Sequence, residues 1–224
     1  MADPHTGPPP GADALPLQTS SLRRFAQRAR EAATESEERC ELCSQPIPAR
    51  HRHLLELVSR ELVCVCRPCS ILFDKRTASL GQYVLVPERR LFLEEFRLGD
   101  DVWASLRLPV GLAFFVESSA RDRVVAYYPS PLGPMESALR LDAWQQIAAD
   151  NPVLQEMTQD VEALLVNRSQ GQRLAAPGDH FLVPISDCYR LSGILRRHWR
   201  GINGGDEVWQ KIEDFFEELQ IACD

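Results

Sequence analysis

The sequence predicts an α+β fold on three observations. Short runs of β-branched, aromatic and alternating residues, such as 83–87 and 111–117, lie between turn-forming residues and predict strands. Two segments near the C-terminus carry apolar residues at helical spacing and predict a helical hairpin. Cysteine is concentrated in a short N-terminal region, which predicts a small module ahead of a mixed sheet-and-helix body.

The N-terminal region divides into three predicted parts. The first eighteen or so residues are rich in proline and poor in large apolar side chains, which predicts disorder. Apolar residues then recur at helical spacing from about residue 20, which predicts a helix. We therefore expect a disordered segment at 1–18, a helix plus the cysteine module at 19–76, and an α+β domain with its C-terminal helical hairpin at 77–224.

Two Cys-x-x-Cys pairs dominate the module: Cys40 with Cys43, and Cys66 with Cys69. A gap of two residues lets both sulfurs of a pair approach one ion. Four thiolates at about 2.3 Å suit tetrahedral zinc, or a single iron ion. The spacing predicts these four cysteines as metal ligands.

Three further residues are candidate ligands of the same centre: Cys64, His51 and His53. Alternation along 62–66 places Cys64 on the same face as Cys66, although Cys64 could also end a strand and point away from the metal. Histidine is a common zinc ligand, but four cysteines already complete a closed site.

The residues between the cysteine pairs predict a zinc-ribbon-like hairpin, with an apolar strand at 54–58, a turn at 59–61 and a return strand at 62–65. A rubredoxin also uses two Cys-x-x-Cys pairs but usually has glycine after each pair, where this chain has Ser44 and Ser70. The expected metal is therefore zinc, with iron as the alternative. So small a hairpin would take most of its folding free energy from the metal.

In the body, 111–117 and 123–128 predict a β-hairpin, and 161–166 and 181–184 predict further strands. The last two helices are predicted from an apolar stripe that includes Leu191 and Leu195, and from a second that includes Val208 and Phe215. The acidic residues of the last helix would repel phosphate, so packing or protein docking is expected of this hairpin in place of DNA recognition.

Charge and hydropathy limit the partners. The net charge is −7, and the cysteine module lacks a basic stripe with interleaved aromatics, so nucleic-acid binding is not expected. The longest near-apolar run, 110–116, is too short to span a bilayer, and no signal-peptide pattern begins the sequence. We expect a cytoplasmic protein, where paired cysteines more often bind metal than form disulfides.

Catalysis is not expected. The polar residues worth testing are Asp179, His180, Asp187, Cys188 and His198. A cysteine in an apolar helix stripe is more often a small core residue than a nucleophile, and the two histidines fit partly buried structural roles. The sequence contains no phosphate loop, nucleophile elbow or His-Glu-x-x-His pattern.

A resemblance covers residues 20–220 or so. The segments at 40–43, 51–54, 64–69, 127–131, 160–168, 183–191 and 198–209 are similar to an uncharacterised bacterial family whose genes commonly lie near those of nickel–iron hydrogenases. The resemblance implies an accessory role in hydrogenase assembly or maturation, through contact with a hydrogenase subunit or another accessory protein. Two alternatives remain: a rubredoxin-like iron electron carrier and a zinc-ribbon nucleic-acid-binding regulator.

Overall fold

A computed structural model describes residues 38–73, 81–108, 111–137, 141–168, 178–201 and 204–223. The disordered segment expected at 1–18 and the helix expected from about residue 20 lie outside the described residues. The chain from Arg39 onward forms one compact unit.

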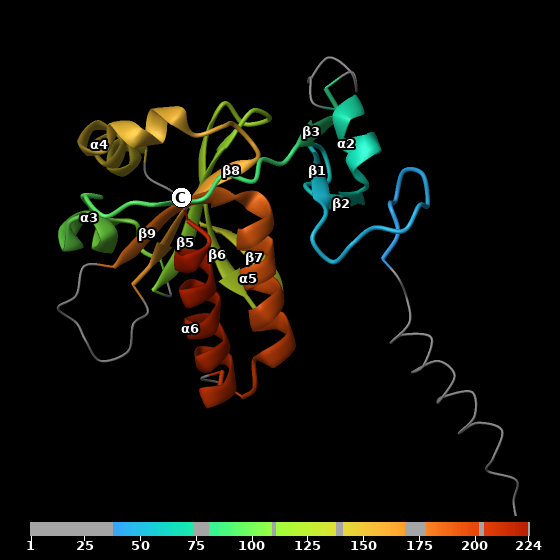
Figure 1. Ribbon diagram of the computed structural model, residues 1–224. Helices are drawn as coiled ribbons and strands as arrows, with labels where there is room; N and C mark the ends of the chain where they lie inside the picture. The colour runs from blue at the N-terminus through green and yellow to red at the C-terminus, as the bar shows by residue number, and fades with distance from the viewer. Residues whose placement is uncertain are drawn as a thin grey trace, which may run out of the picture. The chain divides into compact units, whose positions relative to one another are not determined.

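The described residues form a mixed α+β structure with two antiparallel sheets and five α-helices (Figure 1). In chain order the elements are β1 (Arg52–Glu56), β2 (Leu62–Val65), α2 (Arg67–Leu72), β3 (Tyr83–Leu85), β4 (Leu91–Phe92), α3 (Asp100–Ser105), β5 (Leu112–Ser118), β6 (Arg123–Ser130), β7 (Gly133–Ser137), α4 (Leu141–Asp150), the 3-10 helix η2 (Pro152–Glu156), β8 (Glu162–Asn167), β9 (Asp179–Pro184), α5 (Ile185–His198) and α6 (Asp206–Ile221). We call the described residues 39–86 the N-terminal module and those from β4 to α6 the body. None of the helices within these ranges is long and apolar enough to cross a bilayer.

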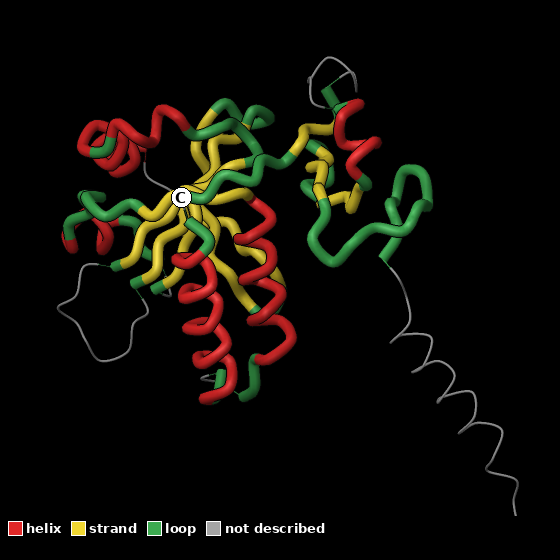
Figure 2. The backbone as a smooth tube through the Cα atoms, in the orientation of Figure 1, coloured by secondary structure: helices red, strands yellow, loops and turns green. Residues whose placement is uncertain are grey.

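The body is built on a six-stranded sheet in the order β4-β9-β8-β5-β6-β7, with every neighbouring pair antiparallel. Figure 2 draws the strands in yellow and the helices in red. The central strand β5 pairs Phe114 with Tyr127 of β6 on one side and with Leu165 of β8 on the other. The expected hairpin of β5 and β6 is present, and β8 and β9 occupy the segments predicted as extended.

Helices cover both faces of this sheet. Because side chains alternate along each strand, neighbouring residues enter two different cores. Phe114 of β5 and Leu165 of β8 lie in one core with α5 and α6, which run side by side (Figure 1). Phe115 and Leu164, one position along, lie in a second core with α3, α4 and η2. Strands buried on both faces explain the nearly continuous apolar composition of β5 and β8.

A tight contact joins the C-terminal helices. Gly204 precedes α6 with φ 86°, and an added Cβ there would lie 2.8 Å from Val208 and 3.2 Å from the Trp199 ring. Glycine therefore allows the start of α6 to approach the end of α5.

The N-terminal module contains the second sheet, with strand order β2-β1-β3. β3 lies beyond the expected domain boundary at residue 76, yet it pairs with β1 through Leu55 and Val84. These two side chains belong to the same core as α5 and α6, whereas Leu54 and Leu85 lie in a separate small core with Cys40. One face of the three-stranded sheet thus packs on the body.

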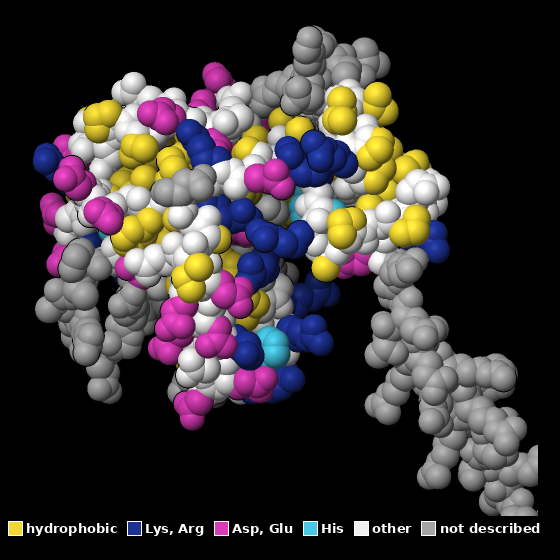
Figure 3. All heavy atoms as spheres, viewed as in Figure 1, with side chains coloured by type: hydrophobic (Ala, Val, Ile, Leu, Met, Phe, Trp, Pro, Cys, Tyr) yellow, Lys and Arg dark blue, Asp and Glu magenta, His cyan; other side chains and the backbone are white. Residues whose placement is uncertain are grey.

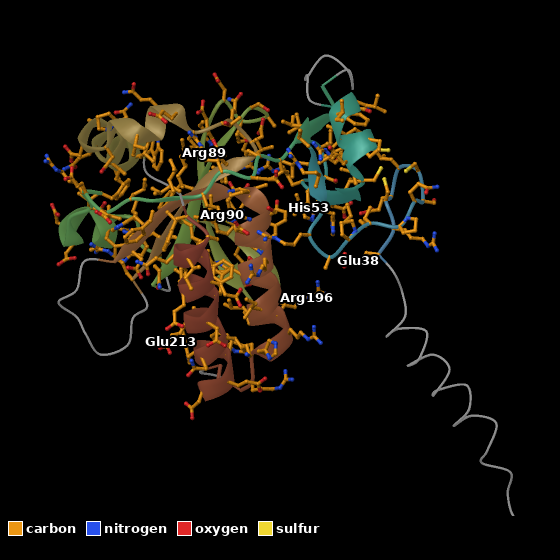
Figure 4. All side chains as sticks on the ribbon, in the orientation of Figure 1. Glu38, His53, Arg89, Arg90, Arg196 and Glu213 are labelled. Carbon is orange, nitrogen blue, oxygen red and sulfur yellow. The ribbon has the colours of Figure 1, made fainter. Side chains whose placement is uncertain are left out.

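Three arginine–carboxylate pairs also connect residues 60–90 to the body. Arg60 lies 3.2 Å from Asp160, Arg89 lies 3.0 Å from Glu162 and Arg90 lies 2.8 Å from Asp187. The three carboxylates are buried, and the Arg89 and Arg90 side chains are labelled in Figure 4. Each buried carboxylate therefore has an arginine counterion from an earlier part of the chain.

Candidate metal centre

The first cysteine pair lies on a turn that precedes β1. The Ser44 N–H donates to the Cys40 carbonyl at 2.7 Å, and the Cys40 N–H donates to the Gln45 carbonyl at 2.8 Å. Ser44 has φ 60°, the left-handed conformation that glycine usually supplies after such a pair. The turn brings the Cys40 and Cys43 thiols to one side.

The second cysteine pair lies at the start of a helix. Cys66 is the N-cap of α2, and Cys69 lies in its first turn. Pro68 lacks an N–H and fits the start of the helix, where that group would have no intrahelical partner. The Ser70 N–H donates to the Cys66 carbonyl at 3.0 Å, so Ser70 is a helical residue, unlike Ser44.

The four cysteines are close enough to hold a metal ion. The sulfur atoms of Cys40, Cys43, Cys66 and Cys69 all lie within 4.8 Å of one another, and those of Cys43 and Cys66 are 3.6 Å apart. Cys40 is buried, Cys43 is exposed and the other two are partly buried. Four thiol groups suit zinc or a single iron ion.

The electrostatics of the cluster favour a cation. Burial alone would raise the pKa of Cys40, but N–H groups of Cys66, Cys43 and Leu42 donate to its sulfur and lower that pKa to about 6. A hydrogen bond with Cys66, together with the other neighbouring thiols, raises the pKa of Cys69 to about 12. Four thiolates this close can ionise together only when a cation offsets their charge.

Cys64, His51 and His53 form a second group. One ligand atom from each of these residues lies within 4.8 Å of those of the other two. Cys66 belongs with the four cysteines and Cys64 belongs with the two histidines, although only one residue separates them. The sequence alone predicts all three residues as candidate ligands of the four-cysteine centre. Their grouping follows from the pairing of His53 with Cys64 across β1 and β2, a register that the alternation pattern alone did not determine.

The residues considered for catalysis have other contacts. The Asp187 carboxylate accepts two hydrogen bonds from Arg90, and the His198 Nδ1 lies 2.8 Å from the Glu207 carboxylate. Burial raises the pKa of Cys188 well above its usual value. His180 is buried, its ring stacks on Phe96, and burial lowers its pKa to about 4. Within the described ranges, no other set of three His, Cys, Asp or Glu side chains gathers closely enough to hold a metal.

The sequence model of a family of unknown function, DUF5947, matches residues 39–223. The match includes both sheets and both groups of candidate metal ligands. No curated protein and no solved structure matches the chain.

Proposed function

Because the chain belongs to DUF5947, a family of unknown function, we propose a function from its own residues: a non-catalytic, zinc-binding accessory protein that acts through protein–protein contacts. The observation that carries the proposal is the convergence of the Cys40, Cys43, Cys66 and Cys69 sulfur atoms within 4.8 Å. Zinc at this centre would join the first turn to the start of α2 and hold the hairpin between them in a zinc-ribbon-like module.

A closed centre supports a structural role. Four protein ligands complete the tetrahedral coordination of zinc and leave no position for a substrate or an activated water. In the body, the Asp187 carboxylate is engaged by Arg90, and His198 is paired with Glu207. These contacts support the proposal that the protein is not an enzyme.

The surface of the N-terminal module supports protein contact. Leu42, Val58, Ile71 and Leu72 are large apolar side chains that are exposed, with Ile71 at 66% and Leu72 at 65%. Figure 3 shows apolar side chains gathered over this part of the molecule. Contiguous exposed apolar surface is typical of protein interaction sites. A metal-stabilised module can present such a surface without a large core of its own.

The partner we propose is a subunit of a nickel–iron hydrogenase or another of its accessory proteins, in the cytoplasm. The support is the resemblance of the segments at 40–43, 64–69 and 183–191 to the family encoded near hydrogenase genes. Under this proposal the protein assists assembly or maturation and performs no chemistry itself.

Metal analysis tests the centre. Protein purified without added metal should contain one equivalent of zinc at the four-cysteine centre and show no visible colour. The variant Cys40→Ser/Cys43→Ser should lose that zinc, whereas Cys223→Ser, outside the cluster, should keep it. Stoichiometric iron with thiolate-to-iron absorption would make the protein an electron carrier, and unchanged zinc in the cluster variant would exclude these cysteines as ligands.

Affinity capture tests the partner. The tagged protein, expressed together with the hydrogenase genes, should retain a hydrogenase subunit or accessory protein. Ile71→Glu/Leu72→Glu should abolish retention without changing the zinc content, whereas Leu132→Glu, at an even more exposed apolar position between β6 and β7, should not. Retention that is equal in all three proteins would place the contact elsewhere, and no retention by the parent would contradict the hydrogenase role.

A further inference from the structure

Two members of the second group of candidate ligands, His53 and Cys64, lie on adjacent strands, and His51 lies directly before β1. His53 of β1 lies directly opposite Cys64 of β2 in the antiparallel register, so their side chains lie on the same face. His51 lies two residues before His53, and their ring centroids are 4.6 Å apart. Figure 4 shows where His53 projects from β1. Strand pairing and period-two alternation therefore bring two imidazoles and one thiol together.

A backbone contact fixes the tautomer of His51. Its Nδ1 lies 2.9 Å from the Pro48 carbonyl oxygen. Because a carbonyl oxygen only accepts hydrogen bonds, Nδ1 carries the proton, and in the neutral ring Nε2 keeps its lone pair. A hydrogen bond from one ring nitrogen to a backbone carbonyl is the usual support of a metal-binding histidine, since it orients the ring and selects the donor atom.

Glu41, which lies between the first pair of cysteines, holds the backbone of Cys64 through two hydrogen bonds. The Cys64 N–H donates to the Glu41 carboxylate at 2.6 Å, and the Cys64 carbonyl accepts the Glu41 N–H at 2.9 Å. Glu41 lies between Cys40 and Cys43, so the turn that carries half of the four-cysteine centre also positions Cys64. This ligand position is therefore set by the fold and does not depend on a mobile loop.

We propose that His51, His53 and Cys64 bind a second metal ion, separate from the four-cysteine centre. Two imidazoles and one thiolate suit a late first-row divalent ion such as Zn²⁺ or Co²⁺. Binding releases the thiol proton of Cys64 to solvent, so uptake is favoured as pH rises. Three protein ligands leave a fourth position open for water or a small anion.

The two centres would differ in net charge and in how readily their metal ion exchanges. A divalent ion with four thiolates carries a net charge of −2 and a closed shell. The same ion with two neutral imidazoles and one thiolate carries +1 and can accept an external ligand. The second ion is therefore expected to exchange more readily than the first. This inference is independent of the accessory role and of the identity of the first metal.

Equilibrium dialysis with Co²⁺ tests the proposal on the full-length protein, which retains the metal it acquires on expression. The parent should take up one further equivalent of Co²⁺, with a thiolate-to-cobalt absorption band. His51→Ala/His53→Ala and Cys64→Ser should lose this equivalent and keep the first metal, which also reports that the module is folded. His198→Ala, a histidine outside the group, should take up Co²⁺ as the parent does.

Three outcomes would overturn the proposal: no Co²⁺ uptake by the parent, unchanged uptake by both variants, or loss of the first metal in the histidine variant of a parent that binds only one. The last outcome would mean that the histidines serve the four-cysteine centre. Failure of the first centre is seen separately, as an unchanged number of metal equivalents in Cys40→Ser/Cys43→Ser.

Discussion

The N-terminal module and the body differ in the size of their cores. The separate core of the module contains only four buried residues, Cys40, Ile47, Leu54 and Val65, and one of them is a candidate metal ligand. The body buries apolar side chains on both faces of a six-stranded sheet. Each fully buried large apolar side chain contributes about 1.5–3 kcal/mol. The body can therefore be stable through burial, whereas we expect the module to depend on metal coordination and on its contact with the body.

Removing the metal should have the largest effect, and it should be confined to the module. Structural zinc contributes on the order of 10 kcal/mol to the folding of small zinc domains. A strong chelator should therefore expose the backbone amides of β1, β2 and α2 while β5 and β8 stay protected. Hydrogen exchange followed by mass spectrometry measures both regions at once. Loss of protection in β5 and β8 at the same chelator concentration would show that the body depends on the metal as much as the module does.

A cavity made in the core of the body should destabilise the body and leave the metal centre of the module intact. Phe115 is fully buried and stacks on Trp144. Phe115→Ala should lower the free energy of unfolding by about 4 kcal/mol, measured by urea denaturation, without changing the metal content. Leu132→Ala, at an exposed position, should change it by less than about 0.5 kcal/mol. Loss of metal from folded Phe115→Ala protein would show that metal binding by the module depends on the core of the body.

Acid should destabilise the body through His180. Burial, with the nearby Arg168 charge, lowers the pKa of His180 from 6.5 to about 4. The unfolded chain therefore binds the proton more tightly than the folded one, so this stability is complete above pH 6.5 and is lost as pH falls toward 4. The full effect is about 3 kcal/mol.

His180→Phe keeps an aromatic ring against Phe96 and removes the titration. The unfolding free energy of this variant should fall less between pH 6.5 and 4 than that of the parent, whereas His198→Gln should follow the parent. Parallel curves for parent and His180→Phe would assign the acid sensitivity to other groups, such as the thiolates of the module.

The smallest effect is expected at the contact between the two regions. Arg60, in the turn between β1 and β2, donates to the buried Asp160 carboxylate and to the Asp160 carbonyl. Arg60→Met should cost about 2 kcal/mol, because a buried carboxylate loses its counterion. Arg121→Met removes the more exposed pair with Glu136 and should cost less than about 1 kcal/mol. If thermal or urea denaturation shows the same loss of stability in Arg60→Met and Arg121→Met, the burial of Asp160 does not strengthen its ion pair.

The elements of the body were largely predictable because their signals are local. The β5–β6 hairpin follows from apolar and β-branched runs around a polar turn, and α6 follows from Val208, Ile212 and Phe215 at helical spacing. β7 was not predicted, because Pro131 precedes this short strand and Pro134 lies within it, and proline argues against a strand. The antiparallel pairing of Leu91 with Leu182 was also missed, since contacts between residues so far apart in the chain leave no local pattern.

The candidate site was predictable in composition but not in arrangement. The Cys-x-x-Cys spacing indicated that Cys40, Cys43, Cys66 and Cys69 converge, and their sulfur atoms do so. Which residues join His53 depends on the strand register, and a shift of one residue would move Cys64 to the other face. The start of α2 at Cys66 was also not predicted, because the Cys-x-x-Cys spacing does not distinguish a turn from the first turn of a helix.

In the three arginine–carboxylate pairs, residues 60–90 supply the positive charges and residues 160–187 supply the buried negative charges. A chain shortened to begin at Leu91 would lack Arg60, Arg89 and Arg90, while Asp160, Glu162 and Asp187 would still occupy buried positions. Such a fragment would keep three buried carboxylates without their counterions, at a cost of about 2–5 kcal/mol for each lost partner. During synthesis from the N-terminus, the arginines leave the ribosome before the carboxylates that they neutralise, so the counterions are already present when those carboxylates become buried.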